Sequence, residues 1–471
     1  MSSYIFPEGF LWGSSTSAWQ VEGGLIDNEY RMLHQRGLIA GSGDPEQSAG
    51  FWTRYESDIG LMRQMHHGSF RMSVEWARVE PEEGRFDEEA IRHYRRIVEA
   101  VVKAGILPVA DLHHHSNPLW ICRDGGWMSF RVVQRLQRFA RRMAEALGDL
   151  VGVWLTINEP TIWAAEAYFT GELPPHAKSP WKFFRCLDLL GKAHVVLYET
   201  LNEVHARRGW PKPAVGFAHA AHGIDPFDSR NPLDRIASRW FRSSFEERFL
   251  SSILKKGRTI DLLGINYYFC MRIRFPLSVR FRTDLPLTKE GWPIDPHGFH
   301  RVLTGAWERH RIPIWVMENG VGEDDDEPRP RFILDHVYQM HRAIRDGADV
   351  RAYHHWATMD TLEYRRGFGI RYGLIGVDMA RAEKTRTIRA SGKMFGEIAA
   401  ANGITEEIVR RYVPEWTPDS FPKGTSMRYG RAGTVGTLPP HRDLRLHAIP
   451  FPVIHSTASR FDRSRCSTER S

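Results

Sequence analysis

Residues 151–160 read VGVWLTINEP and carry the clearest fold signal in the chain. A short apolar run ends here in two polar residues, Asn158 and Glu159, as in a buried strand that leads its last side chains out of a core. Similar runs recur along the chain, and amphipathic, helix-like stretches such as residues 88–104 and 130–147 separate them. This alternation predicts parallel strands joined by helical crossovers.

The run at 151–160 is one of eight. The eight runs cover residues 9–15, 69–76, 106–115, 151–160, 214–222, 262–269, 313–320 and 350–360. Eight strand and helix units within residues 1–412 predict an α/β protein with a single (β/α)8 TIM barrel and long, decorated βα loops. No GxGxxG or GxxxxGK[ST] motif follows a strand, so we expect no nucleotide cofactor.

The pattern stops after Tyr412. Residues 413–471 hold nine Lys and Arg against five Asp and Glu, which accounts for +4 of the net charge of +7 of the 471-residue chain. We therefore expect two parts, a (β/α)8 barrel at 1–412 and an irregular, disordered basic tail at 413–471. A basic arm or a partner motif is the alternative for the tail, although chain ends tolerate non-conforming sequence.

The hydropathy and charge of the chain indicate which kinds of partner the protein can have. No run approaches the roughly 18 apolar residues that a membrane helix requires, and the start MSSYIFPEGF lacks the features of a signal peptide. These features predict a cytoplasmic protein without a membrane partner. The charge outside the tail is nearly balanced, which argues against nucleic acid, and the oligomeric state stays open.

Two glutamates are the strongest candidates for chemistry. Glu159 ends the fourth run in WLTINEP, and Glu318 ends the seventh in IWVMENG. Active sites of such barrels lie at the C-terminal ends of the strands, and a carboxylate there is costly to bury unless it is paired or used. The two residues predict an acid/base or nucleophile pair, with a salt bridge at the barrel mouth as the alternative.

The motifs around these glutamates resemble family 1 of the glycoside hydrolases, the β-glucosidase and β-galactosidase type. The resemblance covers roughly residues 5–398. It rests on FPEGFLWGSSTSAWQVEG, FRMSVEWARVEPEEGRFD, DLHHHSNPLW, TINEP, DLLGINYY, VMENG and DVRAYHHWATMDTLEYRRGFGIRYGL, in this order.

The resemblance implies a retaining β-glycosidase that needs no cofactor and acts on a small β-glycoside or short oligosaccharide. Glu318 would be the nucleophile that forms a glycosyl-enzyme, and Glu159 the acid that protonates the leaving oxygen and later activates water. β-Glucosidase activity is expected first, with β-galactosidase and β-fucosidase activity as a broader range. A transglycosylating or catalytically silent sugar-binding family member is the alternative.

The resemblance also implies the supporting residues. Arg71, Asn158, Asn266 and Tyr268 would support the two glutamates. Gln20, His114, Trp356, Glu363 and Tyr364 would bind the sugar. Each has a plainer alternative, such as a structural ion pair for Arg71 or a core position for Trp356.

Some positions depart from the family. His115 stands where Trp or Phe is usual, and Tyr364 stands where Trp is usual, so the preferred sugar stays open. Glu363 would repel a phosphorylated sugar, and Glu159 argues against the thioglucosidase branch, which lacks this acid. The run His113–His115 raises the question of a metal, but alternation along a strand lets at most His113 and His115 share a face, so we expect no metal.

Overall fold

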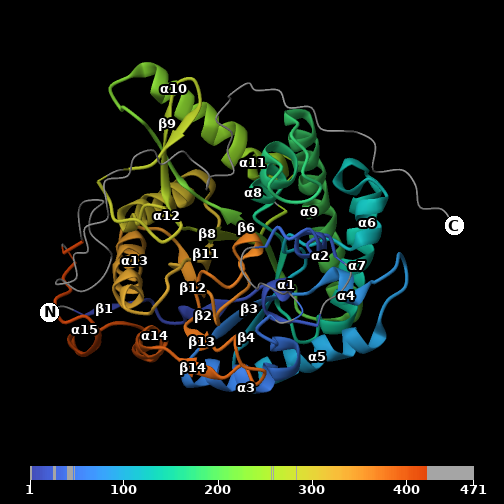
Figure 1. Ribbon diagram of the computed structural model, residues 1–471, viewed down its shortest axis with the longest axis horizontal. Helices are drawn as coiled ribbons and strands as arrows, with labels where there is room; N and C mark the ends of the chain where they lie inside the picture. Colours follow the sequence, from blue (N-terminus) through green and yellow to red (C-terminus); the bar gives the residue numbers. More distant parts are fainter. Residues whose placement is uncertain are drawn as a thin grey trace.

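The computed structural model describes residues 3–24, 28–39, 46, 48–255, 257, 259–282, 284–418 and 420–421. Its centre is a closed barrel of parallel strands surrounded by helices (Figure 1). This confirms the predicted (β/α)8 barrel. The barrel strands are, in order around the barrel, β2 (Leu11–Ser15), β3 (Ser69–Ser73), β4 (Leu107–Asp111), β5 (Val153–Asn158), β6 (Ala214–Ala220), β8 (Leu262–Asn266), β11 (Ile314–Glu318) and β12 (Val350–Trp356).

Each of the eight predicted runs contains one barrel strand, but most strands are shorter than the runs at their C-terminal ends. The run at 106–115, for example, yields β4, which ends at Asp111. The polar residues that follow leave the hydrogen-bonded ladder, and His114 and His115 line a cavity at the barrel mouth. Each predicted run therefore includes a barrel strand and, in most cases, the segment after it that forms part of the barrel mouth.

The helices cover the outside of the barrel with one apolar face. In α5 (Glu88–Lys103), Asp87 caps the first turn by accepting hydrogen bonds from the N–H groups of Glu89 and Ala90, and residues at helical spacing such as Ile91 and Val98 are buried. The predicted helices at 88–104 and 130–147 are thus confirmed. The other long helices are α3 (Phe51–Gln64), α7 (Arg131–Leu147), α9 (Pro180–Arg208), α12 (Pro296–His310), α13 (Pro328–Arg345) and α14 (Ala390–Ala401).

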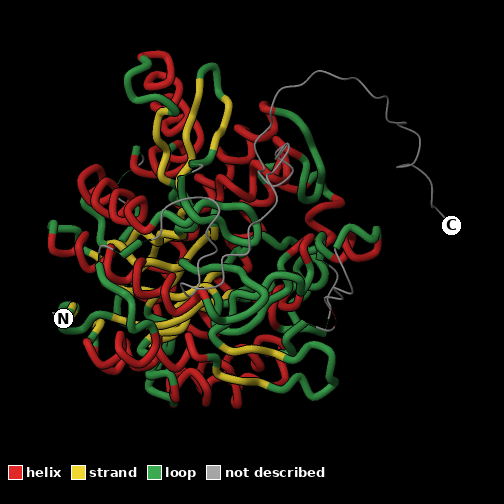
Figure 2. Tube along the Cα trace, turned by 60° about the vertical axis from the view of Figure 1, so that its left-hand side comes forward, coloured by secondary structure: helices red, strands yellow, loops and turns green. Residues whose placement is uncertain are grey.

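A small extension stands out from the barrel beside α11 (Arg248–Leu254), and the sequence did not predict it (Figures 1 and 2). It consists of a three-stranded sheet, ordered β10-β9-β7, and one helix. Strands this short give little periodic signal, so the sequence pattern did not distinguish them from the loops between barrel strands. Its elements are β7 (Gly223–Pro226), α10 (Pro232–Phe241), β9 (Cys270–Arg274) and β10 (Ser278–Arg280).

The packed chain continues beyond the expected boundary at residue 412. Trp416 is fully buried, and its Nε1 donates a hydrogen bond of 2.8 Å to Oδ1 of Asp335 on α13. Its ring also packs edge-on against Tyr338. Residues 413–418 therefore belong to the barrel's packing, whereas the expected disorder of residues 422–471 concerns a segment outside the described residues. In the described part of the chain, no helix is both long and apolar enough to cross a membrane.

Candidate active site

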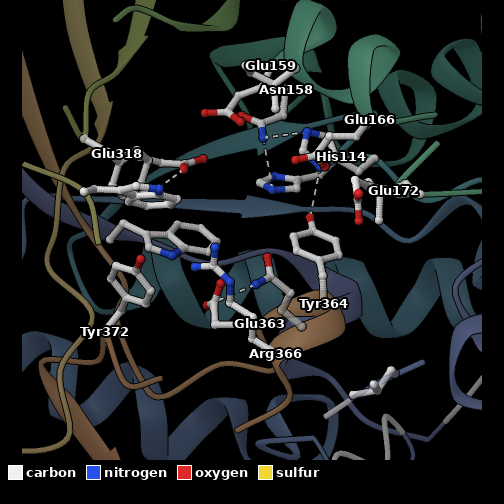
Figure 3. Close-up of a pocket in the computed structure, with 18 of the residues that line it drawn as sticks. His114, Asn158, Glu159, Glu166, Glu172, Glu318, Glu363, Tyr364, Arg366 and Tyr372 are labelled. Carbon is white, nitrogen blue, oxygen red and sulfur yellow. Dashed lines mark hydrogen bonds between the residues drawn. The ribbon is translucent and has the colours of Figure 1, made fainter. Parts of the chain in front are cut away.

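A cavity of about 770 Å³ opens at the C-terminal end of the barrel (Figure 3). Nine of the eleven residues singled out in the sequence line it. The other two, Arg71 and Asn266, lie directly behind the wall and bond to residues that line it. The nine are Gln20, His114, Asn158, Glu159, Tyr268, Glu318, Trp356, Glu363 and Tyr364.

Glu318 is held at the last position of β11. Its Oε1 accepts a hydrogen bond of 2.5 Å from Nη1 of Arg71, and its Oε2 accepts one of 2.8 Å from the hydroxyl of Tyr268. Both oxygens of the carboxyl group are therefore fixed by donors. Donors of this kind stabilise the ionised form and orient it.

Arg71 is completely buried in β3 and joins several strands of the barrel. Its Nη2 donates hydrogen bonds of 2.6 Å to Oδ2 of Asp111 and to Oδ1 of Asn158. Asp111, the last residue of β4, was not singled out from the sequence, although it lies within the third run at 106–115. A buried arginine between two carboxyl groups keeps its charge, so it supports Glu318 electrostatically.

Glu159 begins helix α8 (Pro160–Ala165) with a backbone φ of +41°, in the left-handed region. Pro160 fixes the first helical position, and the N–H of Glu159 donates to the carbonyl of Ala218 on the neighbouring strand. Its Oε1 accepts a hydrogen bond of 3.0 Å from Nδ2 of Asn266. Figure 3 shows the carboxyl groups of Glu159 and Glu318 directed into the same space.

The surroundings of the two glutamates favour different protonation states. Burial raises the pKa of Glu159, and the nearby charge of Glu318 raises it further. Burial also raises the pKa of Glu318, but the charge of Arg71 and the hydrogen bonds from Arg71 and Tyr268 oppose it. These surroundings favour the ionised form of Glu318 and the protonated form of Glu159.

The three histidines at 113–115 are arranged differently from the expectation. His114 and His115 both line the cavity, with ring centroids 5.2 Å apart, whereas His113 bonds to Asn117 outside it. The predicted alternation fails because β4 already ends at Asp111 and His115 has a φ of +68°. Burial lowers the pKa of both His114 and His115 well below its usual value, so both rings are neutral.

Neutral histidines offer their ring nitrogens to polar neighbours. Nδ2 of Asn158 lies 3.1 Å from Nε2 of His114, and the hydroxyl of Tyr364 lies 3.1 Å from Nδ1 of His115. The two family departures, His115 and Tyr364, therefore form one bonded pair. Among the described residues, no group of three or more His, Cys, Asp or Glu side chains could hold a metal ion.

Gln20 and Glu363 form another part of the cavity wall. Nε2 of Gln20 donates to Oε1 of Glu363 at 3.3 Å, and the hydroxyl of Thr361 bonds to the same carboxyl group. Burial raises the pKa of Glu363 to about 7. Trp356, which is 4% exposed, ends β12 with its ring nearly parallel to that of His114. Polar groups beside an aromatic face suit a ring with several hydroxyl groups.

Sequence reasoning missed other residues that line the cavity, among them Glu166, Glu172, Trp292, Arg366 and Tyr372. Glu166, Glu172 and Trp292 lie in segments without a periodic pattern and outside the recognised motifs, so no sequence signal marked them. Arg366 and Tyr372 lie within the last recognised motif, residues 349–374, but were not singled out from it.

The fold and this cavity together define the class of (β/α)8 barrel proteins with a pair of carboxyl groups at the mouth. Residues 2–260 and 253–404 match the family described as glycosyl hydrolase family 1. The chain belongs to this family.

Individual relatives agree with this assignment. A β-galactosidase of Sulfolobus acidocaldarius is 29% identical, over 86% of this chain and 96% of its own. A solved β-glycosidase from Pyrococcus horikoshii is 33% identical, with a TM-score of 0.80 over 88% of this chain and 99% of its own. A β-glucosidase from Thermotoga maritima in complex with glucoimidazole is 25% identical, with a TM-score of 0.79 over 85% of this chain and 100% of its own.

Proposed function

We propose that this protein is a retaining β-glycosidase that removes terminal, non-reducing β-linked sugars by double displacement, with Glu318 as nucleophile and Glu159 as acid and base. One observation carries the proposal. Two carboxyl groups enter the same cavity from β11 and from the start of α8, and only that of Glu318 is bonded to an arginine. A pair with different protonation states is what the double displacement requires.

The chemistry follows from this asymmetry. The Glu318 carboxylate attacks the anomeric carbon while the bond to the leaving oxygen breaks and Glu159 gives its proton to that oxygen. Glu318 is then an ester without charge, so its effect on Glu159 disappears and the pKa of Glu159 falls. Glu159, now ionised, takes a proton from water as the water attacks the anomeric carbon and releases Glu318.

The lining of the cavity supports an uncharged sugar. Among the lining residues, five are glutamates, and Arg366 is the only arginine or lysine. A phosphorylated sugar needs cationic partners and would be repelled by these carboxyl groups. The β-galactosidase and the β-glucosidase named above support glucosides and galactosides as substrates, and activity on fucosides stays a prediction from the sequence. A cytoplasmic location stays a prediction from the sequence.

Labelling tests the nucleophile and the mechanism together. The protein is incubated with an activated 2-deoxy-2-fluoro-β-glucoside, which forms the glycosyl-enzyme quickly and hydrolyses it slowly, and is then examined by intact mass and peptide mapping. We expect one fluorohexosyl adduct on Glu318 and none on the Glu318→Gln variant. An adduct on another residue would contradict the assignment of Glu318. Absence of labelling with the gluco, galacto and manno reagents alike, together with sugar binding, would indicate a silent barrel.

A further inference from the structure

Exposed apolar side chains gather on the extension that stands beside the barrel. Of the ten large hydrophobic residues that are exposed in the described part of the chain, six lie between residues 227 and 277. Isolated exposed apolar residues are normal, but a cluster of them marks a surface that binds something. We call the six residues the apolar tip: Phe227, Leu233, Ile236, Trp240, Phe275 and Leu277.

Three of the six form a stripe along α10. Leu233, Ile236 and Trp240 follow the spacing i, i+3 and i+7, so they share one side of the helix, and they are 48%, 59% and 46% exposed. Ala237 and Phe241 face the protein instead. The helix therefore has an inner apolar face that packs and a second apolar stripe that remains uncovered.

The segments that carry Phe227 and Phe275 are held beside the start of α10 by the buried side chain of Asp234. Its Oδ1 accepts the N–H of Phe275 at 2.8 Å, and its Oδ2 accepts the N–H of Asp228 at 3.1 Å. These bonds join the turn between β9 and β10, the segment after β7 and the start of α10. Phe227, Leu233 and Phe275 are thereby held at one end of the extension.

Arginines accompany the apolar tip. Arg230, Arg235, Arg239 and Arg274 are exposed, and none of them forms an ion pair with a described residue. The guanidinium carbon of Arg274 lies 5.4 Å from the ring centroid of Phe227. Between residues 226 and 245, the only exposed carboxylate is that of Asp228. The surface therefore combines apolar side chains with unpaired positive charge.

We propose that the apolar tip and its arginines dock this enzyme onto the surface of an anionic lipid bilayer. A helix with an apolar stripe and a cationic flank lies in the plane of the interface, with Trp, Leu and Phe inserted among the headgroups and Arg near the phosphates. A symmetric contact between two copies would instead set these arginines against one another. Residues 422–471 of this chain hold nine Lys and Arg against three Asp and Glu, so their charge also disfavours them as the group that covers the tip.

The docking surface adjoins the cavity. His222 and Phe269 line the cavity, and each is followed directly by a strand of the extension, β7 after His222 and β9 after Phe269. The extension that carries the tip is therefore joined at its base to the wall of the cavity. The finding that no helix among the described residues could span a membrane concerns insertion across a bilayer and leaves this peripheral contact open.

Flotation with lipid vesicles tests the proposal. The full-length protein is mixed with vesicles of phosphatidylcholine alone or with 30 mol% phosphatidylglycerol, and the floating fraction is measured. We expect binding to the anionic vesicles that weakens in 0.5 M NaCl. The pair Arg235→Glu and Arg239→Glu should lower the partition coefficient on the order of 30-fold or more, since each arginine near such a surface contributes roughly fivefold. Ile236→Ser with Trp240→Ser should lower it at either salt concentration.

Matched controls lie on α5, away from the extension. Arg92→Glu with Arg96→Glu makes the same change of charge, and Val102→Ser removes an exposed apolar side chain; neither should alter flotation. All variants should keep wild-type turnover of a soluble aryl glycoside, which separates this proposal from the proposed activity. Equal flotation of the α10 variants and the wild type would overturn it. So would a wild-type dimer that Trp240→Ser dissociates and that does not bind vesicles, because the partner would then be a second copy.

Discussion

Nδ2 of Asn266 lies 3.0 Å from Oε1 of Glu159. This hydrogen bond stabilises the ionised form of Glu159 and lowers the pKa that burial raises. Asn266 therefore tunes the acid of the pair, although it lies behind the wall of the cavity.

We expect Asn266→Ala to move the alkaline limb of the kcat/KM profile to higher pH. Loss of the hydrogen bond raises the pKa of Glu159, and the protonated form is the one that donates to the leaving oxygen, so activity persists to higher pH. Rates with an aryl β-glucoside from pH 4 to 10 measure the limbs, which belong to the coupled pair. Asn202→Ala on α9 is the control, and a shift to lower pH would contradict the role of Asn266.

Glu159→Ala should affect substrates according to their leaving groups. General acid help contributes typically 100-fold to 10,000-fold where the leaving group is poor and far less where it is activated. We therefore expect a loss in this range for an alkyl β-glucoside and a much smaller loss of the first step for a dinitrophenyl β-glucoside. Steady-state and burst kinetics with both substrates check this. Equal losses would assign Glu159 a different role.

Arg71→Met should destabilise the barrel by about 3–5 kcal/mol, because Glu318 and Asp111 lose a buried partner. Without the arginine the pKa of both carboxyl groups rises further above the unfolded value. The folded variant then binds more protons than the unfolded chain, so its stability falls as pH rises. Urea unfolding should show a larger deficit at pH 8 than at pH 5, whereas a deficit independent of pH would exclude this cause.

Truncation at two positions tests whether the C-terminal residues that pack on the barrel contribute to its stability. A chain that ends at residue 421 should keep wild-type stability and activity. A chain that ends at residue 412 loses Trp416, whose burial is complete, and leaves the carboxyl group of Asp335 without its indole donor. We expect a loss of about 3–5 kcal/mol, as for removal of a core tryptophan. Thermal unfolding compares the two chains, and equal midpoints would show that Trp416 contributes nothing.

The sequence predicted the barrel and most of the site because both depend on strong local patterns. Buried parallel strands are continuous apolar runs, and Glu159 and Glu318 end two of them in recognisable motifs. Asp111 also ends a barrel strand, yet it was missed because its run ends in the more conspicuous histidines.

Other features depend on contacts that a linear pattern does not contain. Alternation misplaced His113 and His115 because it assumes that a strand continues, and β4 stops at Asp111. Trp416 lies in a segment without periodicity, and its partner, Asp335 on α13, is 81 residues away in the sequence. The extension around α10 consists of short strands paired across tens of residues, which local propensity does not register.

Barrel closure has a consequence for biosynthesis. The first barrel strand pairs with the last, from Leu11 with Ala352 to Ser15 with Trp356. The paired positions are 341 residues apart in the sequence, a distance that takes roughly 20 to 70 s to translate at about 5–20 residues per second. During that time one edge of β2 has no partner, and an open edge invites pairing with other chains. Nascent chains of this enzyme therefore depend on protection of that edge, and the catalytic cavity is completed only near the end of translation.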